Sequence, residues 1–451
     1  MKALSALLAA VCLACLPGFS VAGSASTEPQ TEKRPKVLFV GVDGASWKVI
    51  GPLLKSGQLP ALARLHRQGA HAPDFDTLEE AVASPLIWTT IATGRTPADH
   101  GIESFVTPLP NGAMVPVTSS SRKARAIWEI ANRNGMTAGI IGYWASWPAE
   151  RIRGYVITDH ANAAFSEFLV RDGRLWRGAD PAFLSRLRRD FYPPDIGATL
   201  AKHWITREDF PYQDLQDRAG YSPEQTEQLG KAPWNVFGDY YSLLKTMYRV
   251  DFPLFLIAQD LISSRPTDLV MLYLHGPDPI QHVAWDLAEP GAFEEPNANL
   301  ERDRGLVEGV YRAVDSMLGE LLEDIDENTW VMVASDHGVQ ASTADRSRPG
   351  EHPYSAKGVL FLDGPHVKPG YRIKGATPYD LMPTLAWLLD IPLSEELEGR
   401  ILTDAFEAEF VSARPVTKVA SYGARETSTP QKSEGDKLML DLLNALGYIE
   451  N

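Results

Sequence analysis

Short apolar runs alternate along the chain with amphipathic helical patterns. Runs over residues 36–42, 138–143, 267–275 and 329–335 have the length and β-rich composition of buried parallel strands. Between the last two, apolar residues recur every three or four positions, as on one face of a helix. They are Leu306, Val310, Val314, Met317, Leu321 and Ile325. The alternation predicts an α/β fold, a mainly parallel central sheet flanked by helices.

Residues 160–262 do not follow this alternation. The segment is rich in aromatic residues, and its patterns are helical or irregular without a clear strand. Its aromatic residues include Trp176, Trp204, Phe210, Tyr212, Trp234, Phe237, Tyr240 and Tyr241. We interpret it as a mostly helical insertion, or cap, on a catalytic domain over residues 36–410; the alternative is a continuous part of the core. A cap should line one wall of the active-site pocket with its aromatic residues, Trp204 and Trp234 among them, and such a wall would favour a nucleobase or another flat leaving group. For residues 411–451, the sequence predicts a polar tail that ends in a short helix docked on the domain.

The first 22 residues have the features of a cleaved secretory signal. An apolar run over residues 3–16 follows a lysine, and small residues precede the expected cleavage after Ala22. This run is too short to cross a membrane, and no later stretch is long and apolar enough. Cys12 and Cys15 both lie inside the signal, so the mature chain would form no disulfide. We expect an exported protein, periplasmic or secreted, with residues 23–35 as a linker; lipid attachment at Cys15 is the alternative.

Charge excludes one class of partner. The 451 residues include 43 Lys and Arg against 58 Asp and Glu, a net charge of −15, and no basic run is long enough to form a stripe. Binding to duplex nucleic acid is therefore not expected, because it depends on neutralising phosphates. A local cationic site is still compatible with this composition if metal ions supply its charge.

Acidic and histidine residues follow the predicted strands. They are Asp43, Asp278, His282, Asp336, His337 and His352. Ligands of open α/β sheets bind at the carboxyl ends of the strands, so these side chains are candidates for one site. The i,i+4 spacing of Asp278 and His282 places both on one face of a helical turn. Three Asp and three His form a donor set that suits zinc, with manganese as the alternative.

A serine introduces the next predicted helix. Ser84 has the position of an N-cap, Pro85 lies in the first turn, and Gly94 ends the helix. A capping serine is the simpler interpretation. A hydroxyl at a helix N-terminus is also well placed to act as a nucleophile, because the helix dipole favours an anionic group there.

Together these motifs resemble the alkaline phosphatase superfamily, in the branch of type I phosphodiesterases and nucleotide pyrophosphatases. The resemblance covers residues 36–399 apart from 160–262. It is carried by Gly41-Val-Asp43-Gly44, Ser84 with Thr93-Gly94, Pro97-Ala-Asp-His100-Gly101, Asp278–His282, Ser335-Asp336-His337-Gly338 and His352. It implies an alkaline phosphatase-like core with two divalent metal ions and a serine nucleophile.

The resemblance also assigns the ligands. One ion would be held by Asp278, His282 and His352, and the other by Asp43, Asp336, His337 and the oxygen of Ser84. Two divalent cations would leave a net positive pocket in an acidic protein and would stabilise the attacking and leaving oxygens of an in-line displacement. Ser84 would then form a covalent phosphoseryl intermediate that water hydrolyses.

Several positions depart from the family pattern. Pro85 has no N–H to offer a phosphoryl group, and Phe105 stands where the phosphodiesterase branch has Asn. No arginine matches the phosphate-clamping arginine of alkaline phosphatases, and the sulfatase signature Cys/Ser-x-Pro-x-Arg is missing. The candidates for substrate contacts are Arg95, Arg122, Lys123 and His275.

The sequence thus predicts an exported two-metal phosphoester hydrolase with Ser84 as nucleophile. Its substrate would be a phosphorylated small molecule, a lipid or a nucleotide. Phosphodiester or nucleotide-type substrates are the first expectation and phosphomonoesters the second, because the clamping arginine is missing and a dianionic terminal phosphate needs more positive charge than a diester. The alternatives are a phosphomonoesterase, a phospho-group transferase or mutase, and a metal-stabilised binding protein without catalysis.

Overall fold

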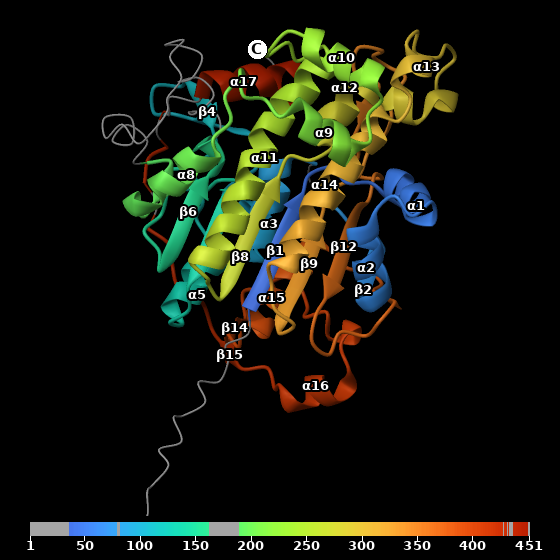
Figure 1. Ribbon diagram of the computed structural model, residues 1–451. Coiled ribbons are helices and arrows are strands. Elements are labelled where there is room, and N and C mark those ends of the chain that lie inside the picture. Colours follow the sequence, from blue (N-terminus) through green and yellow to red (C-terminus); the bar gives the residue numbers. More distant parts are fainter. Residues whose placement is uncertain are drawn as a thin grey trace, which may run out of the picture. The chain divides into compact units, whose positions relative to one another are not determined.

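A nine-stranded sheet lies at the centre of the part of the chain that the computed structural model describes (Figure 1). The described residues are 36–78, 82–161, 189–426, 428–430, 432 and 436–449, all within the unit Pro35–Asn451. The strand order is β13-β2-β12-β9-β1-β8-β5-β6-β7. The predicted signal over residues 1–22, with Cys12 and Cys15, and the linker over 23–35 lie outside the described residues.

Five adjacent strands form the parallel part of the sheet: β9 (Thr329–Ala334), β1 (Lys36–Val42), β8 (Leu269–Leu274), β5 (Ala138–Tyr143) and β6 (Gly154–Thr158). The outer strands are β13 (Tyr371–Arg372), β2 (Ala70–Phe75), β12 (Gly358–Asp363) and β7 (Phe191–Tyr192). β12 runs antiparallel to β9 and β2, and β7 runs antiparallel to β6. The predicted mainly parallel α/β fold is confirmed.

Helices cover both faces of the sheet (Figure 1). On β1, Leu38 and Val40 pack into one apolar cluster and Val37 and Phe39 into another, because successive side chains of a strand point to opposite faces. The first cluster takes residues from α1 (Trp47–Lys55), α2 (Pro60–Gln68), α11 (Tyr240–Ser264), α12 (Asp278–Ala288) and α14 (Leu306–Glu323). The second takes them from α3 (Ser84–Thr93), α5 (Ile127–Arg133) and α15 (Leu381–Leu388).

The remaining elements are short. Helices are α4 (Pro97–His100), α8 (Gly197–His203), α9 (Tyr212–Ala219), α10 (Pro223–Lys231), α13 (Leu300–Asp303), α16 (Ala408–Ala413) and α17 (Asp436–Ala445), with 3-10 turns at Pro194–Ile196, Pro290–Ala292, Pro378–Asp380 and Thr403–Ala405. Small sheets pair β3 (Val106–Pro108) with β4 (Met114–Pro116), β10 (Gln340–Ala341) with β11 (Gly350–Glu351), and β14 (Leu393–Ser394) with β15 (Lys418–Val419). None of the helices in the described ranges is long and apolar enough to cross a membrane.

The described part of the 160–262 segment is mostly helical. Its longest helix, α11, packs against β8 and α12, so it covers the sheet directly. The segment also contains one short strand, β7, at the sheet edge, where the sequence pattern indicated none. Residues 162–188, with Trp176, lie outside the described ranges. The division into a core and an inserted cap stays a prediction.

Candidate active site

The sequence-predicted ligands meet at the carboxyl ends of three neighbouring strands. β1 lies between β8 and β9 in the sheet, so the residues that follow these strands share one edge. Asp43 follows β1, Asp278 begins α12 after β8, and Asp336 and His337 follow β9. His352 comes directly after β11. The fold thus gathers side chains that lie up to about 300 positions apart along the sequence.

Their ligand atoms form two overlapping groups. Potential ligand atoms of Asp278, His282 and His352 lie within 4.8 Å of one another, and so do those of Asp43, Asp278 and His337. His282 Nε2 is 3.5 Å from Asp278 Oδ1, and His337 Nε2 is 3.3 Å from Asp43 Oδ1. Asp336 Oδ2 is 3.4 Å from His337 Nε2. Asp278 is therefore shared between the two groups.

His282 and His337 both present their Nε2 atom to the carboxylates. The Nδ1–H group of His282 donates to the Gly350 carbonyl at 3.0 Å, and that of His337 donates to the Gly338 carbonyl at 3.1 Å. Each bond leaves the Nε2 lone pair pointing at the acidic cluster. Outer hydrogen bonds of this kind orient metal-binding histidines and fix their tautomer.

Burial makes this cluster costly without a cation. Asp43 and Asp278 are each 3% exposed, and Asp336 is fully buried. Burial, and next the charge of Asp278, raises the pKa of Asp43, and burial together with Asp43 raises the pKa of Asp336. Burial acts in the same direction on Asp278, but His282 outweighs it and lowers the pKa of that carboxyl. Burial also lowers the pKa of His352, so its imidazole favours the neutral, ligating form.

Several buried atoms of the cluster have no hydrogen-bond partner among the described residues. They are Asp278 Oδ1, Asp336 Oδ2 and His337 Nε2. Buried polar atoms are normally paired, and oxygen and imidazole nitrogen are the donors that divalent zinc or manganese takes. The residues present therefore fit divalent metal ions.

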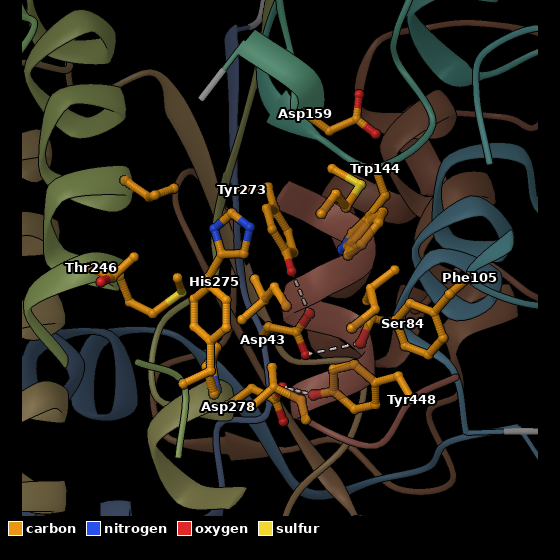
Figure 2. A pocket seen from close by; sticks show the side chains of 18 residues that line it. Asp43, Ser84, Phe105, Trp144, Asp159, Thr246, Tyr273, His275, Asp278 and Tyr448 are labelled. Atoms are coloured by element: carbon orange, nitrogen blue, oxygen red, sulfur yellow. Dashed lines mark hydrogen bonds between the residues drawn. The ribbon is translucent and has the colours of Figure 1, made fainter. Parts of the chain in front are cut away.

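Ser84 lies beside this cluster at the start of α3. It is the first helical residue, and Ala83 holds the N-cap position expected for Ser84. Helix boundaries shift by one residue easily, and the hydroxyl still lies at the N-terminal end. Ser84 is 1% exposed, and its Oγ–H donates to Asp43 Oδ1 at 3.4 Å. Figure 2 shows the two side chains facing each other.

Two aromatic residues that the sequence analysis missed hold Asp43. Tyr273 O–H donates to Asp43 Oδ2, and the indole N–H of Trp88 donates to the same atom at 3.3 Å. Trp88 approaches β1 so closely that a Cβ on Gly41 would lie 2.7 Å from its ring. Both aromatic residues lie inside apolar stretches, where the sequence pattern indicates core packing alone.

Tyr448 is a third missed residue, and it comes from the C-terminal end of the chain. Its O–H donates to Asp278 Oδ2, as Figure 2 shows. The same oxygen lies 2.9 Å from His282 Nε2. Its ring stacks on Phe105, with centroids 4.5 Å apart and planes at 12°. Phe105, which departs from the family pattern, is therefore the platform for this tyrosine.

Three of the four predicted substrate contacts do not reach the site. Arg122 is 1% exposed, donates to Glu129 and Glu150, and lies over Trp128. Arg95 pairs with Glu396 at 2.9 Å and with Asp99 at 3.3 Å. Lys123 is exposed and packs its stem near Gly101. Arg95 and Arg122 are paired with carboxylates outside the cluster, and none of the three cations lines the pocket beside Ser84.

His275 does lie at the site. Its Nδ1 and its backbone N–H are each 3.0 Å from Asp251 Oδ1, on α11. Burial lowers its pKa, but the hydrogen bond and charge of Asp251 outweigh burial and raise it. The imidazole ring also contacts Tyr273, with centroids 5.2 Å apart.

A pocket opens next to Ser84. Its empty volume is about 800 Å³ when the part that is open to solvent is included. Its lining residues are Asp43, Ser84, Phe105, Trp144, Asp159, Phe237, Thr246, Met247, Val250, Tyr273, His275, Asp278, Pro279, Met439, Leu442, Leu443, Leu446 and Tyr448. No lysine or arginine is among these described residues. Trp204 and Trp234, expected to form an aromatic wall, do not line this pocket either, whereas Phe237 does.

Curated relatives match a limited part of the chain. Two 2,3-bisphosphoglycerate-independent phosphoglycerate mutases from strains of Cereibacter sphaeroides are 30% identical over 141 residues, which is 31% of this chain and 24% of each mutase. The chain thus matches about a quarter of the length of these relatives.

Solved structures and a family model match more of the chain. Murine ectonucleotide pyrophosphatase/phosphodiesterase 5 in complex with AMP has a TM-score of 0.48 at 13% identity, and the human protein has 0.47 at 14%; each match covers 83% of this chain and 100% of the other. The family model of type I phosphodiesterase/nucleotide pyrophosphatase matches residues 37–376. The predicted resemblance is confirmed: the chain belongs to the type I phosphodiesterase/nucleotide pyrophosphatase family.

Proposed function

We propose that the protein is a metal-dependent phosphoester hydrolase of the phosphodiesterase type, with Ser84 as its nucleophile. The observation that carries the proposal is the position of Ser84 Oγ, 3.4 Å from Asp43, beside a buried cluster of carboxylates and imidazoles. Membership of the phosphodiesterase family supports the reaction class.

The residues for two divalent ions follow from the two groups of ligand atoms. Asp278, His282 and His352 would hold one ion, and Asp43, Asp336, His337 and Ser84 Oγ would hold the other. Zinc suits this donor set, with manganese as the alternative. When bound, the ions supply positive charge that offsets the carboxylates and stabilises charge on the phosphoryl oxygens.

The chain's own residues orient the nucleophile. Asp43 accepts the hydrogen bond of Ser84, while Trp88 and Tyr273 hold the Asp43 carboxylate from its other oxygen. The start of α3 favours negative charge near Ser84 Oγ. Attack of Ser84 Oγ on phosphorus would break the bond to one ester oxygen, which leaves as an alcohol with the proton lost by the serine, and the other ester group would stay on the phosphoryl group bound to Ser84. Water would then break the bond between Ser84 Oγ and phosphorus, which releases the phosphomonoester and restores the serine hydroxyl.

The neighbouring hydroxyls are poor substitutes for Ser84. Thr89 Oγ1 donates to the Pro85 carbonyl at 2.6 Å, and Thr90 Oγ1 is bonded to the Leu86 carbonyl and to His100. Both are engaged inside the buried helix α3. This engagement supports Ser84 as the nucleophile of the proposal.

The test is Ser84→Ala in metal-loaded protein, assayed with bis(4-nitrophenyl) phosphate. Hydrolysis should fall by at least ~10³-fold, as expected for loss of a covalent nucleophile, with the fold retained. The matched control is Ser119→Ala, because Ser119 is equally buried but donates to the Pro148 carbonyl and does not line the pocket. A rate near that of the unmodified protein in Ser84→Ala would overturn the assignment.

A diester is the preferred substrate of this proposal. The described residues that line the pocket include three aspartates and no lysine or arginine, so the second negative charge of a monoester lacks a protein cation. Comparing 4-nitrophenyl phosphate with its methyl diester tests this preference. A higher kcat/KM for the monoester would favour a phosphomonoesterase instead.

Transfer to an alcohol is the second candidate. The partial similarity to phosphoglycerate mutases is the observation that favours it. Both reactions would begin at Ser84 and differ in the acceptor of the phosphoryl group. Product analysis in the presence of glycerol separates them, because a transferase would form glycerol phosphate in excess over the hydrolysis product.

Export through residues 1–22 is also part of the proposal. Fractionation of cells that produce the full chain tests it. A processed protein in the periplasm or medium would support export, and an unprocessed cytoplasmic protein would contradict it.

A further inference from the structure

The C-terminal segment 436–449 forms one wall of the pocket beside Ser84. It contributes Met439, Leu442, Leu443, Leu446 and Tyr448. Leu443 and Leu446 are each 3% exposed, so the segment is packed on the domain. Figure 1 shows α17, in dark red, near the upper ends of the parallel strands, and Figure 2 shows Tyr448 next to Asp278.

Tyr448 anchors the segment to the site, and Arg425 anchors the chain that precedes it. Tyr448 bonds Asp278 at the floor of the site, as described above. Before α17, the guanidinium of Arg425 binds Glu129, Glu150 and the carbonyl oxygens of Ser119 and Arg122. The wall is therefore a built part of the site.

The opposite wall is apolar as well. Phe237, Met247 and Val250 come from the segment that includes α11, and Phe105 and Trp144 close the side near Ser84. We call the end of the pocket lined by Asp43, Asp278 and Ser84 its floor. A phosphoester held at Ser84 must then direct one of its substituents between these two walls.

We propose that this pocket binds an alkyl or acyl chain, so that the substrate is an amphiphilic phosphodiester in which one ester group is a long apolar chain. The inference rests on the proposed function, since it takes the phosphoryl group to lie at Ser84. It names the substrate class that the C-terminal wall selects.

The polar groups away from the floor are already engaged. Asp159 accepts hydrogen bonds from Ser146 and from the backbone N–H groups of Ala145 and Trp147. Thr246 Oγ1 donates to the Ser242 carbonyl at 2.8 Å. A nucleobase or sugar would lose water at these walls without gaining partners, which costs free energy, whereas an alkyl chain has no such groups to desolvate.

One buried polar atom of the lining, Trp144 Nε1, has no hydrogen-bond partner among the described residues. His275 lines the pocket as well, and its Nδ1 is bonded to Asp251. Both rings contact Tyr273, which binds Asp43 at the floor. The two rings therefore lie at the phosphate end of the pocket, where the free N–H group of Trp144 suits an oxygen of the ester rather than a distant base.

The aromatic ring of Phe105 offers little free surface for stacking. Tyr448 already stacks on one face of Phe105, and Trp144 meets Phe105 edge-on with centroids 6.0 Å apart. The rest of the wall is methionine, leucine and valine, whose flexible or branched side chains pack well against methylene groups. The lining thus favours a chain over a flat ring.

The experiment measures kcat/KM for alkyl 4-nitrophenyl phosphate diesters with methyl, butyl and octyl groups, in metal-loaded protein below the micelle concentration. All three release the same nitrophenol, so the rates differ through the alkyl group alone. We expect a rise of about two- to fourfold per buried methylene, which corresponds to up to ~0.8 kcal/mol each. The 4-nitrophenyl ester of thymidine 5′-phosphate is the competing substrate and should be slower than the octyl ester.

A wall variant tests the C-terminal segment directly. Met439→Gln combined with Leu442→Gln changes two half-buried lining residues and should lower the octyl-to-methyl ratio of kcat/KM at least tenfold. Leu440→Gln lies on the same helix, does not line the pocket and should keep the ratio. If the double variant does not fold, competitive inhibition of the unmodified protein by alkylphosphonates of increasing length replaces it, with tighter inhibition by longer chains expected.

The outcomes separate this inference from the proposed function. If the unmodified protein hydrolyses none of the diesters, both the proposed function and the alkyl-chain inference are refuted. Hydrolysis of the methyl ester without dependence on chain length, or a preference for the thymidine ester, would refute the alkyl-chain inference alone. An unchanged octyl-to-methyl ratio in a folded double variant would show that the C-terminal segment does not select the substrate.

Discussion

Glu150→Gln should destabilise the protein and loosen its C-terminal segment. Glu150 accepts hydrogen bonds from Arg122 Nη2 at 2.8 Å, from the indole N–H of Trp128 at 2.7 Å and from Arg425 Nη2. The side chains are 14% exposed for Glu150, 1% for Arg122 and 10% for Arg425. Glutamine keeps the shape of Glu150 but removes its charge and can present an N–H group to the guanidinium groups.

The loss of stability in Glu150→Gln can be estimated from the ion pairs that remain around the two arginines. Breaking a buried ion pair by removing one partner costs about 3–5 kcal/mol, because the other charge stays buried without compensation. Here Glu129 still pairs with Arg122 at 2.7 Å and with Arg425 at 3.2 Å. We therefore expect a loss at the lower end, about 3 kcal/mol in the free energy of unfolding.

The pH dependence has a definite sign. Burial raises the pKa of Glu150, but the charges of Arg122 and Arg425 and the hydrogen bond from Trp128 outweigh it and lower the pKa below its usual value. A carboxyl with a lowered pKa in the folded state stabilises the protein above its ordinary pKa, and this stabilisation is lost as the pH falls through the folded value. The difference between the two proteins should therefore be full at neutral pH and shrink below about pH 4.

The assay is chemical denaturation followed by tryptophan fluorescence, with limited proteolysis of the native state as a second readout. Cleavage after Arg425 should become faster in Glu150→Gln, because this arginine anchors the C-terminal segment. The control is Glu227→Gln, which removes a carboxylate from a fully exposed pair with Lys231 and should leave stability unchanged. Equal stability of Glu150→Gln and the unmodified protein at pH 7 would refute the reasoning.

Three further variants test the site and its surroundings. Gly41→Ala places a Cβ 2.7 Å from the ring of Trp88, so it should cost about 1–3 kcal/mol in unfolding free energy and lower kcat, because Trp88 holds Asp43; denaturation and steady-state assays measure both. Asp336→Asn should bind less zinc or manganese by elemental analysis, and a chelator should lower the melting temperature as well as the activity; full metal content would refute its role as a ligand. Trp234→Ala removes the ring beneath Lys245, whose Nζ lies 4.3 Å from the ring centroid, and should lower stability while KM stays unchanged, since Trp234 does not line the pocket. A raised KM would instead place Trp234 in the substrate site.

The sequence predicted the parallel strands well because their signal is local. A short apolar run that is buried on both faces can be recognised without knowledge of its neighbours. The runs over 36–42 and 138–143 match β1 and β5 residue for residue. The helix α14 ends at Glu323, two residues before the last residue of the predicted apolar stripe, Ile325. The position of Ser84 within its helix was off by one, because capping depends on backbone angles that residue types indicate only approximately.

The carboxylates and histidines of the candidate site could also be located from the sequence. Each follows a strand, and the carboxyl ends of parallel strands meet at one edge. Residues that act by local position, such as Asp278 and His282 on one helical turn, are therefore accessible to sequence reasoning. The positions of the basic side chains could not be predicted in this way, because the partner of an arginine depends on which carboxylate the fold brings near it. Arg122 pairs with Glu129 and Glu150 instead of facing the site.

By itself, the sequence thus determined the α/β fold and the edge of the sheet where the chemistry lies. The tertiary structure alone decided which side chains complete that edge. Tyr448 reaches Asp278 across 170 positions of the sequence and rests on Phe105, while Trp234 packs on Phe210 and does not line the pocket. No local periodicity encodes such contacts, because they depend on where a distant helix packs, and that position is set by the combined burial of residues from many elements. The apolar wall beside Ser84 arises in this way, from leucines whose spacing in the sequence indicates only a docking helix.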